Sequence, residues 1–380
     1  MATIVPPDYT GGGLVNLVAT LAARWGVDTG HVPLQGSDGL TDGTERVLLF
    51  VCDALGYLEL QGHLAHGVMP RLAARLSSGE AQLRTLTSVF PSTTAAALST
   101  LHTGATPAEH GHLGYGLWLD GDDGVTDMLQ GRDRATGAER PWPPSRPALT
   151  SRLSATGVCC RAVNAAAFAG SPLSRWHFAG ADYRPWYGIH TVPTLVADAL
   201  QGAGPIYVTA YWPEHDTLCH AYGPDSAQIR DEAAALDFVF DRLLGRLPRD
   251  GNTLVLLTGD HGQRRLRPEA AVFLNDLGAG APGGERCAVY LRDRPGLAAA
   301  LAPYATIHPM DAVWSAGWFG GPPTDTGFRR RTGDLLALPR DGWQLLWRGF
   351  VTGMGAEPHR GGHGGLTADE MLVPLVTLRL

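Results

Sequence analysis

The chain has 380 residues, of which 44% are hydrophobic, and it carries a formal net charge of -7. This length and apolar content suit a folded, soluble enzyme of one large or two ordinary domains and exclude a disordered chain. The negative charge argues against a general nucleic-acid-binding protein, because contacts to phosphates require a basic face.

The N-terminal segment, MATIVPPDYTGGGLVNLV, has no basic start followed by a long apolar run. Nowhere do roughly eighteen uncharged apolar residues stand together, so we expect no membrane-spanning segment. The five cysteines are odd in number and show no paired CxxC spacing, which indicates neither a disulfide framework nor a thiolate zinc site. We therefore expect a cytoplasmic protein without a membrane partner, and the sequence leaves its oligomeric state open.

Apolar runs of strand length alternate with helix-like stretches along the chain. Strands are predicted at 47–52, 158–163, 206–210 and 253–257, and helices at 70–76, 94–101 and 226–247. The runs 206–210 and 253–257 are almost continuously apolar, as in parallel strands that helices cover on both faces, and 226–247 is a natural crossover between them. We predict an α/β fold with a mostly parallel central sheet and helices on both faces.

Residues 1–380 are expected to form a single catalytic domain. Stretches rich in glycine and proline, notably 121–147 and 278–284, are typical of excursions rather than of domain linkers. The segment from about 265 to 355 precedes a late histidine and is long enough to form a smaller inserted subdomain beside the site.

Two acidic residues follow predicted strands directly. Asp53 comes after 47–52, and Asp260, followed by His261 and Gly262, comes after 253–257. Open α/β sheets bind ligands at the carboxyl ends of their strands, and carboxylate and imidazole groups are ligands of divalent metals. The alternatives are an aspartate that caps the next helix in the first case and a polar turn in the second.

Asp216 and His220 stand four residues apart in YWPEHDTLCHAYGPDS, so a helical turn would project both side chains from one face. Such a pair suits zinc or a similar first-row metal, although a surface pair without a ligand has the same spacing. His363 lies in GGHGG, where flanking glycines permit close approach of the backbone to an ion or a phosphate; a flexible exposed loop is the alternative.

Thr94 is the candidate nucleophile. With Ser92 and Thr93 it opens the alanine-rich helix, where unpaired amide groups and the helix dipole favour an anion such as phosphate. A threonine hydroxyl is a poor nucleophile at neutral pH, but coordination to a divalent cation lowers its pKa. The alternative is that these hydroxyls only cap the helix.

The order of these motifs resembles the alkaline phosphatase superfamily, most closely its nucleotide pyrophosphatase/phosphodiesterase branch. In that family a strand-end Asp comes first, followed by a Thr or Ser nucleophile nine residues before a Thr-Gly pair, then D-x-x-x-H, D-H-G and a late His. Thr94 stands nine residues before Thr103-Gly104, and the matched motifs span 53–363. The resemblance implies two divalent metal ions, zinc or manganese, one held by Asp216, His220 and His363 and the other by Asp53, Asp260 and His261, with Thr94 bridging toward the latter ion.

The nucleophile segment differs from that of the branch. The branch places its nucleophile before Phe-Pro, whereas this chain has Val89 before Phe90-Pro91 and hydroxyls only after the proline. Thr93 and Ser92 therefore stay open as alternatives to Thr94. The C-x-P-x-R motif of the sulfatases in the superfamily is absent.

Two tyrosines are candidates for substrate binding. Tyr115 stands where the branch carries an Asn that hydrogen-bonds a phosphoryl oxygen. Tyr211, five residues before Asp216, matches an aromatic residue that stacks on nucleotide bases in the branch, and a core tyrosine is the alternative.

These observations predict a metal-dependent hydrolase of phosphodiester or pyrophosphate bonds in small molecules such as nucleotides, through a phosphothreonine intermediate on Thr94. No arginine is evident beside Thr94 in the sequence, which favours diesters, because the extra negative charge of a monoester needs a cationic partner. The alternatives are a phosphomonoesterase, a phosphomutase, and a metal-binding protein without turnover.

Overall fold

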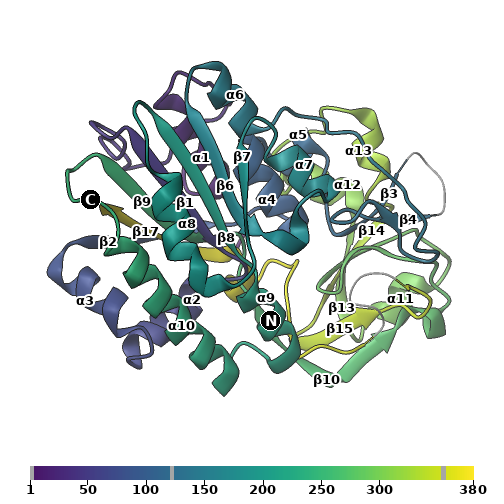
Figure 1. Ribbon diagram of the computed structural model, residues 1–380. Helices are drawn as coiled ribbons and strands as arrows, with labels where there is room; N and C mark the ends of the chain where they lie inside the picture. Colours follow the sequence, from purple (N-terminus) through teal and green to yellow (C-terminus); the bar gives the residue numbers. More distant parts are fainter. Residues whose placement is uncertain (1–3, 120–123, 352–356) are drawn as a thin grey trace.

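The computed structural model describes residues 4–119, 124–351 and 357–380, and its centre is a seven-stranded sheet (Figure 1). The strand order is β2-β17-β9-β1-β8-β6-β7, and β17 alone runs in the direction opposite to the other six strands. The strands are β1 (Arg46–Cys52), β2 (Ala81–Thr87), β6 (Cys159–Ala165), β7 (Asp182–Trp186), β8 (Ile206–Trp212), β9 (Thr253–Gly259) and β17 (Leu372–Arg379).

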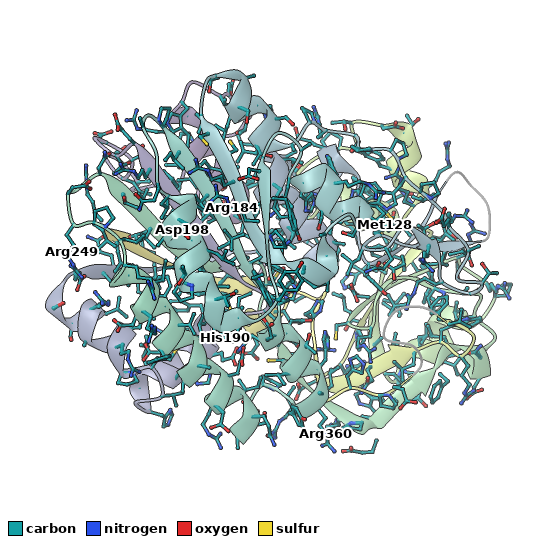
Figure 2. All side chains as sticks on the ribbon, viewed as in Figure 1. Met128, Arg184, His190, Asp198, Arg249 and Arg360 are labelled. Atoms are coloured by element: carbon teal, nitrogen blue, oxygen red, sulfur yellow. The ribbon has the colours of Figure 1, made fainter. Side chains whose placement is uncertain are left out.

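Helices cover both faces of this sheet, as predicted. Apolar side chains of α2, α3, α8 and α10 form one buried cluster with one face, and those of α1, α4 and α6 form another with the opposite face. Side chains fill the space between these layers (Figure 2). The helices are α1 (Leu14–Ala23), α2 (Tyr57–Ala65), α3 (Pro70–Ser78), α4 (Thr94–Thr103), α6 (Leu149–Ala155), α8 (Val192–Ala199) and α10 (Ala227–Leu244).

The predicted central elements are confirmed. β1, β6, β8 and β9 coincide with the four runs predicted as strands, and α3, α4 and α10 with the three predicted helices. The runs are apolar throughout because a helix layer buries each face: all seven residues of β9 are buried. Directly after Thr94, α4 has three consecutive alanines that are fully buried, and their small side chains let the helix lie close to the sheet.

A second seven-stranded sheet lies beside the first, with order β13-β14-β12-β11-β3-β4-β5 and antiparallel pairing (Figure 1). A three-stranded sheet, β15-β10-β16, accompanies it. The strands are β3 (Gly116–Trp118), β4 (Val125–Asp127), β5 (Arg132–Asp133), β10 (Arg264–Phe273), β11 (Gly283–Glu285), β12 (Ala288–Leu291), β13 (Ala305–Pro309), β14 (Leu335–Pro339), β15 (Gly342–Leu346) and β16 (Gly361–Gly362).

The second sheet combines two distant segments of the chain. β3, β4 and β5 come from 116–133, and β11 to β14 come from 283–339. The limits expected for the inserted subdomain, about 265 and 355, stay a prediction, and the upper limit lies outside the described residues. Short helices complete this part and its junctions: α5 (Pro107–His110), α7 (Pro172–His177), α9 (Glu214–Tyr222), α11 (Leu297–Leu301), α12 (Met310–Ser315), α13 (Thr326–Arg330) and α14 (Ala368–Met371).

The two large sheets meet where α4 begins. The hydroxyl of Thr93, directly before α4, donates a hydrogen bond to Glu285 Oε1 of β11 at 2.5 Å. The carboxyl ends of β1, β8 and β9 therefore lie at a junction with the second sheet. Across the described ranges, none of the helices has both the length and the apolar character needed to span a membrane.

Candidate active site

Three neighbouring strands of the central sheet deliver acidic residues to one edge. β8 and β9 flank β1 in parallel and in register. Asp53 and Asp260 directly follow β1 and β9, and α9, which begins just after β8, carries Asp216 and His220. His363 comes from a different part of the chain, where it directly follows β16.

Asp53, Asp260 and His261 form a first cluster, whose donor atoms lie within 4.8 Å of one another. The Nε2 atom of His261 is 3.5 Å from both Asp53 Oδ1 and Asp260 Oδ2. The other oxygen of Asp260 accepts hydrogen bonds of 3.0 Å from the amides of Ala54 and His261. Ala54 adopts a left-handed conformation, with φ of 62°, a costly geometry that aims its amide at Asp260.

Asp216, His220 and His363 form a second cluster, again with donor atoms within 4.8 Å. Asp216 Oδ1 is 3.3 Å from His220 Nε2 and 3.6 Å from His363 Nε2. The glycines around His363 serve close packing: a Cβ on Gly361 would lie 2.4 Å from the carbonyl oxygen of Cys219, so only glycine lets β16 approach α9 here. The two clusters are adjacent, because the rings of His261 and His363 stack at 3.9 Å.

The three histidines of the clusters share one orientation. The Nδ1 atom of each lies 2.9 to 3.1 Å from a main-chain carbonyl oxygen, those of Gly361, Gly262 and Ser92 for His220, His261 and His363. A carbonyl oxygen only accepts, so the proton of each neutral ring sits on Nδ1 and the lone pair of Nε2 points at the carboxylates. A histidine that binds a metal is held in this way.

The buried polar atoms at the centre need a counter-charge. Asp53 Oδ1, Asp260 Oδ2 and His220 Nε2 are buried and have no hydrogen-bond partner within the described residues. Burial and the neighbouring Asp260 and Asp216 raise the pKa of Asp53 well above its usual range. Burial also lowers the pKa of His363 well below its usual range, which keeps its Nε2 free to bind. Such oxygen and imidazole donors fit divalent cations.

Of the three hydroxyl residues at the start of α4, Thr94 lies closest to these clusters. Its Oγ1 is 3.2 Å from His261 Nε2. The hydroxyl of Thr93 points to Glu285, and that of Ser92 donates to the carbonyl oxygen of Gly365 at 2.8 Å. In the described part of the chain, neither of the latter two hydroxyls forms a hydrogen bond with a member of the two clusters.

The structure also locates the two candidate tyrosines. The hydroxyl of Tyr211, on β8, donates to Asp53 Oδ2, and its ring faces Phe168 at 6.2 Å, where both line a cavity of about 80 Å³ beside Thr94. The hydroxyl of Tyr115 donates to Asp127 Oδ2 at 2.6 Å, which leaves its ring to line a larger cavity.

That larger cavity, about 220 Å³ in volume, contains guanidinium groups, so the expectation of no arginine near Thr94 is wrong. Thr94, Asp216 and His363 line it together with Arg134 and Arg286. The two arginines come from the second sheet and the loops around it, distant in sequence from Thr94, and reach the cavity only because β3, β4 and β11 belong to one sheet. No local motif marks them.

The two arginines differ in their partners. Arg286 donates to Gln344 Oε1 at 3.0 Å and contacts His359 Nε2 at 3.2 Å. Arg134 lies 4.8 Å from the ring centroid of Tyr115 and 3.9 Å from that of Phe350, and its Nε is buried without a hydrogen-bond partner in the described ranges. The sequence motifs also give no indication of Gln263, whose Nε2 donates a hydrogen bond to Asp216 Oδ1 at 2.6 Å.

Solved structures with this architecture include murine ectonucleotide pyrophosphatase/phosphodiesterase 5, at 16% identity over 87% of each chain with a TM-score of 0.64. An inactive threonine-to-alanine variant of that protein in complex with AMP matches at 16% identity over 87% of each chain, with a TM-score of 0.63. Phosphonoacetate hydrolase from Sinorhizobium meliloti 1021 in complex with phosphonoformate matches at 17% identity over 89% of this chain and 91% of that chain, with a TM-score of 0.64. The similarity of this chain to these three structures shows its fold. No curated protein matches the chain by sequence.

Family assignment comes from the sequence match. Residues 47–349 match the family described as type I phosphodiesterase / nucleotide pyrophosphatase. This span contains all of β1 except its first residue, the whole of α4, α9 and β9, and five of the six clustered side chains. Because this match covers most of the chain, the protein belongs to the type I phosphodiesterase / nucleotide pyrophosphatase family, within the alkaline phosphatase superfamily, and is a phosphoric ester hydrolase.

Proposed function

We propose that this enzyme hydrolyses phosphodiester or pyrophosphate bonds in small molecules such as nucleotides, with Thr94 as its nucleophile. The observation that carries the proposal is the position of Thr94 Oγ1, 3.2 Å from His261 Nε2 at the first residue of α4. The amide groups at the start of a helix attract a phosphoryl group, and the two clusters stand beside it.

Two divalent ions, for which we propose zinc or manganese, fit the donor set Asp53, Asp260 and His261 and the donor set Asp216, His220 and His363. When bound, such ions lower the pKa of a coordinated hydroxyl and neutralise the charge that develops on the phosphoryl and leaving oxygens. The protein contributes the orientation of these donors. The main-chain carbonyls fix the imidazoles, and Gln263 and Tyr211 hold Asp216 and Asp53.

The proposed reaction has two displacements on phosphorus. Thr94 Oγ1 loses its proton to water and bonds to phosphorus as the bond from phosphorus to the leaving oxygen breaks. Water then bonds to phosphorus, the bond to Thr94 Oγ1 breaks, and a proton returns to Oγ1. With a diester, the leaving oxygen takes up a proton from water and departs as an alcohol in the first step, and the second step releases a phosphate monoester.

The related structures support both the nucleophile and the substrate class. A threonine-to-alanine variant of the murine enzyme is described as inactive and binds AMP. The bacterial relative binds phosphonoformate, a small molecule that carries a carboxylate besides its phosphonate. Tyr211 and Phe168 line a cavity beside Thr94, in a place suited to an aromatic base.

A phosphomonoesterase is the second candidate, and Arg134 is the observation that favours it. A monoester or a terminal phosphate carries more negative charge than a diester. A half-buried guanidinium whose Nε has no hydrogen-bond partner in the described residues is a suitable hydrogen-bond donor to that charge. A cytoplasmic location, expected from five cysteines that are all unpaired, also stays a proposal.

Metal removal and refilling test the function. Treatment with a chelator should abolish hydrolysis of bis(p-nitrophenyl) phosphate, and addition of zinc or manganese should restore it. p-Nitrophenyl phosphate, measured in parallel, ranks the monoester against the diester. Full activity in metal-free protein would contradict the proposed mechanism.

A further inference from the structure

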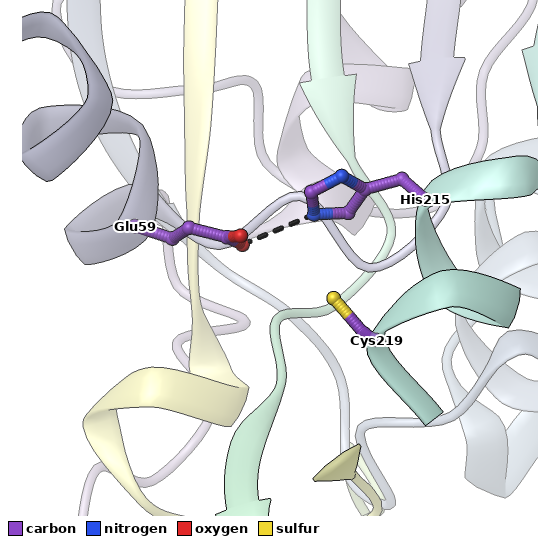
Figure 3. Close-up of side chains that lie close together, drawn as sticks. All are labelled: Glu59, His215 and Cys219. Carbon is purple, nitrogen blue, oxygen red and sulfur yellow. Dashed lines mark hydrogen bonds and ion pairs between the residues drawn. The ribbon is translucent and has the colours of Figure 1, made fainter. Parts of the chain in front are cut away.

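A third group of potential metal ligands lies outside the two clusters. Glu59 on α2 and His215 and Cys219 on α9 place an oxygen, a nitrogen and a sulfur atom within 4.8 Å of one another. His215 Nε2 is 3.1 Å from Glu59 Oε2, and the Cys219 side chain points into the same space (Figure 3). His215 and Cys219 are fully buried.

The spacing on both helices is that of a two-helix metal site. His215 and Cys219 are four residues apart, so they project from one face of α9. On α2, Glu59 and His63 have the same spacing, and His63 Nε2 lies 3.4 Å from Glu59 Oε1. Each oxygen of Glu59 therefore faces a different imidazole, and the sulfur lies beside the Glu59–His215 pair.

An ion pair between Glu59 and His215 explains only part of this arrangement. It leaves the Cys219 thiol without a function, and in the described part of the chain that thiol forms no hydrogen bond. A buried cysteine is often a small apolar residue. Here, however, the thiol lies within reach of an imidazole and a carboxylate, and the combination of thiolate, imidazole and carboxylate is preferred by zinc.

We propose that Glu59, His215 and Cys219 form a third metal site, which binds zinc in a structural role. In the ion pair with Glu59 the His215 ring carries a proton on both nitrogens, so binding releases two protons to solvent, one from the Cys219 thiol and one from His215 Nε2. The lone pair of Nε2 then faces the ion and Nδ1 keeps its proton. His63 or a water molecule supplies the fourth ligand. The sequence, which lacks a CxxC spacing, indicates no thiolate zinc site. This proposed site uses a single cysteine, so a CxxC search does not detect it.

The surroundings of the site bear on how an ion enters it and on what the ion would stabilise. A surface cavity of about 580 Å³, lined by Glu59, His63 and Gln263, opens the Glu59 side of the site to solvent, whereas His215 and Cys219 do not line it. An ion there would crosslink α2, which begins shortly after Asp53, to α9, which carries Asp216. The third ion would thus fix the separation of the two catalytic clusters without touching substrate.

Metal counting on the intact protein tests the proposal. After reconstitution with zinc and removal of loose ions, elemental analysis should find three zinc ions per wild-type chain and two in Cys219→Ala. Cys160→Ala, which removes a buried cysteine on β6 outside the cluster, should keep three. In the cobalt-substituted protein, the near-ultraviolet thiolate-to-cobalt band should be present in wild type and Cys160→Ala and lost in Cys219→Ala.

The thiolate band separates this proposal from the proposed function, because the two catalytic clusters contain only oxygen and nitrogen donors. Absence of the band in the wild-type protein, or its persistence in Cys219→Ala, would overturn the third site. A strong band in a protein that hydrolyses no phosphate ester would support the site and count against the proposed function alone. Should Cys219→Ala not fold, Glu59→Gln provides the second variant: two zinc ions support the site and three overturn it.

Discussion

Replacing Arg134 by glutamine tests how the enzyme recognises charge on its substrate. The guanidinium lies between the rings of Tyr115 and Phe350, in the cavity that Thr94 also lines. A hydrogen bond to a charged group is worth about 1.5–3 kcal/mol. Since 1.36 kcal/mol corresponds to tenfold in rate, loss of one such contact lowers kcat/KM by roughly 13- to 160-fold.

The assay compares p-nitrophenyl phosphate with bis(p-nitrophenyl) phosphate on the metal-loaded enzyme. The Arg134→Gln variant should lose its activity toward the monoester by that factor and change little toward the diester, whose phosphoryl group carries less charge. Arg292→Gln is the matched control, because Arg292 also lies over a ring, that of Trp118 at 5.0 Å, but does not line the cavity. Equal losses on both substrates, or no loss on either, would refute a role in charge recognition.

Three further predictions concern the nucleophile, the base-binding cavity and the pH dependence of stability. Thr94→Ala should abolish hydrolysis with metal content near wild type while Thr93→Ala retains activity; the reverse result would move the nucleophile by one residue. Tyr211→Ala should raise KM for a nucleotide ester by the equivalent of about 1–3 kcal/mol of stacking and barely change KM for the aryl diester. Tyr211→Phe keeps the ring but removes the hydrogen bond to Asp53, so it should leave both KM values nearly unchanged and lower kcat for both substrates. Burial lowers the pKa of His102 from 6.5 to about 3, so the unfolded chain binds this proton first and the free energy of unfolding should fall as pH drops from 6.5 toward 3. Urea unfolding should show a weaker fall for His102→Gln than for the exposed control His190→Gln, and identical profiles would contradict this assignment.

The two clusters of potential metal ligands could be predicted from sequence because their positions are set locally. Asp53 and Asp260 stand at ends of apolar runs, and the carboxyl ends of neighbouring parallel strands must share one edge. Asp216 and His220 follow a third such run at helical spacing. Once three strands are identified, the meeting of these side chains follows from the topology of the sheet.

The substrate side of the cavity has no such local signal. Arg134 and Arg286 become neighbours of Thr94 through antiparallel pairing of short strands from two distant segments, and their sequence surroundings contain no motif. β17 is equally hard to predict, because Pro374 lies inside it and removes a ladder N–H from a central strand. The positions of the two arginines and of β17 both depend on pairing between strands that are far apart in the sequence.

The proposed chemistry and the proposed charge recognition therefore lie on different sheets, and a hydrogen bond from Thr93 to Glu285 links them. Glu285 of β11 accepts the Thr93 hydroxyl at 2.5 Å, and the next residue, Arg286, lines the cavity. Thr93 directly precedes the proposed nucleophile, so a shift of β11 would move the start of α4 together with the cationic wall. Among the described residues, the Arg134 side chain forms no hydrogen bond or ion pair with α4, and its guanidinium lies beside the rings of Tyr115 and Phe350. Changes at Glu285 should consequently alter kcat and KM together, whereas changes at Arg134 should alter the discrimination between substrates.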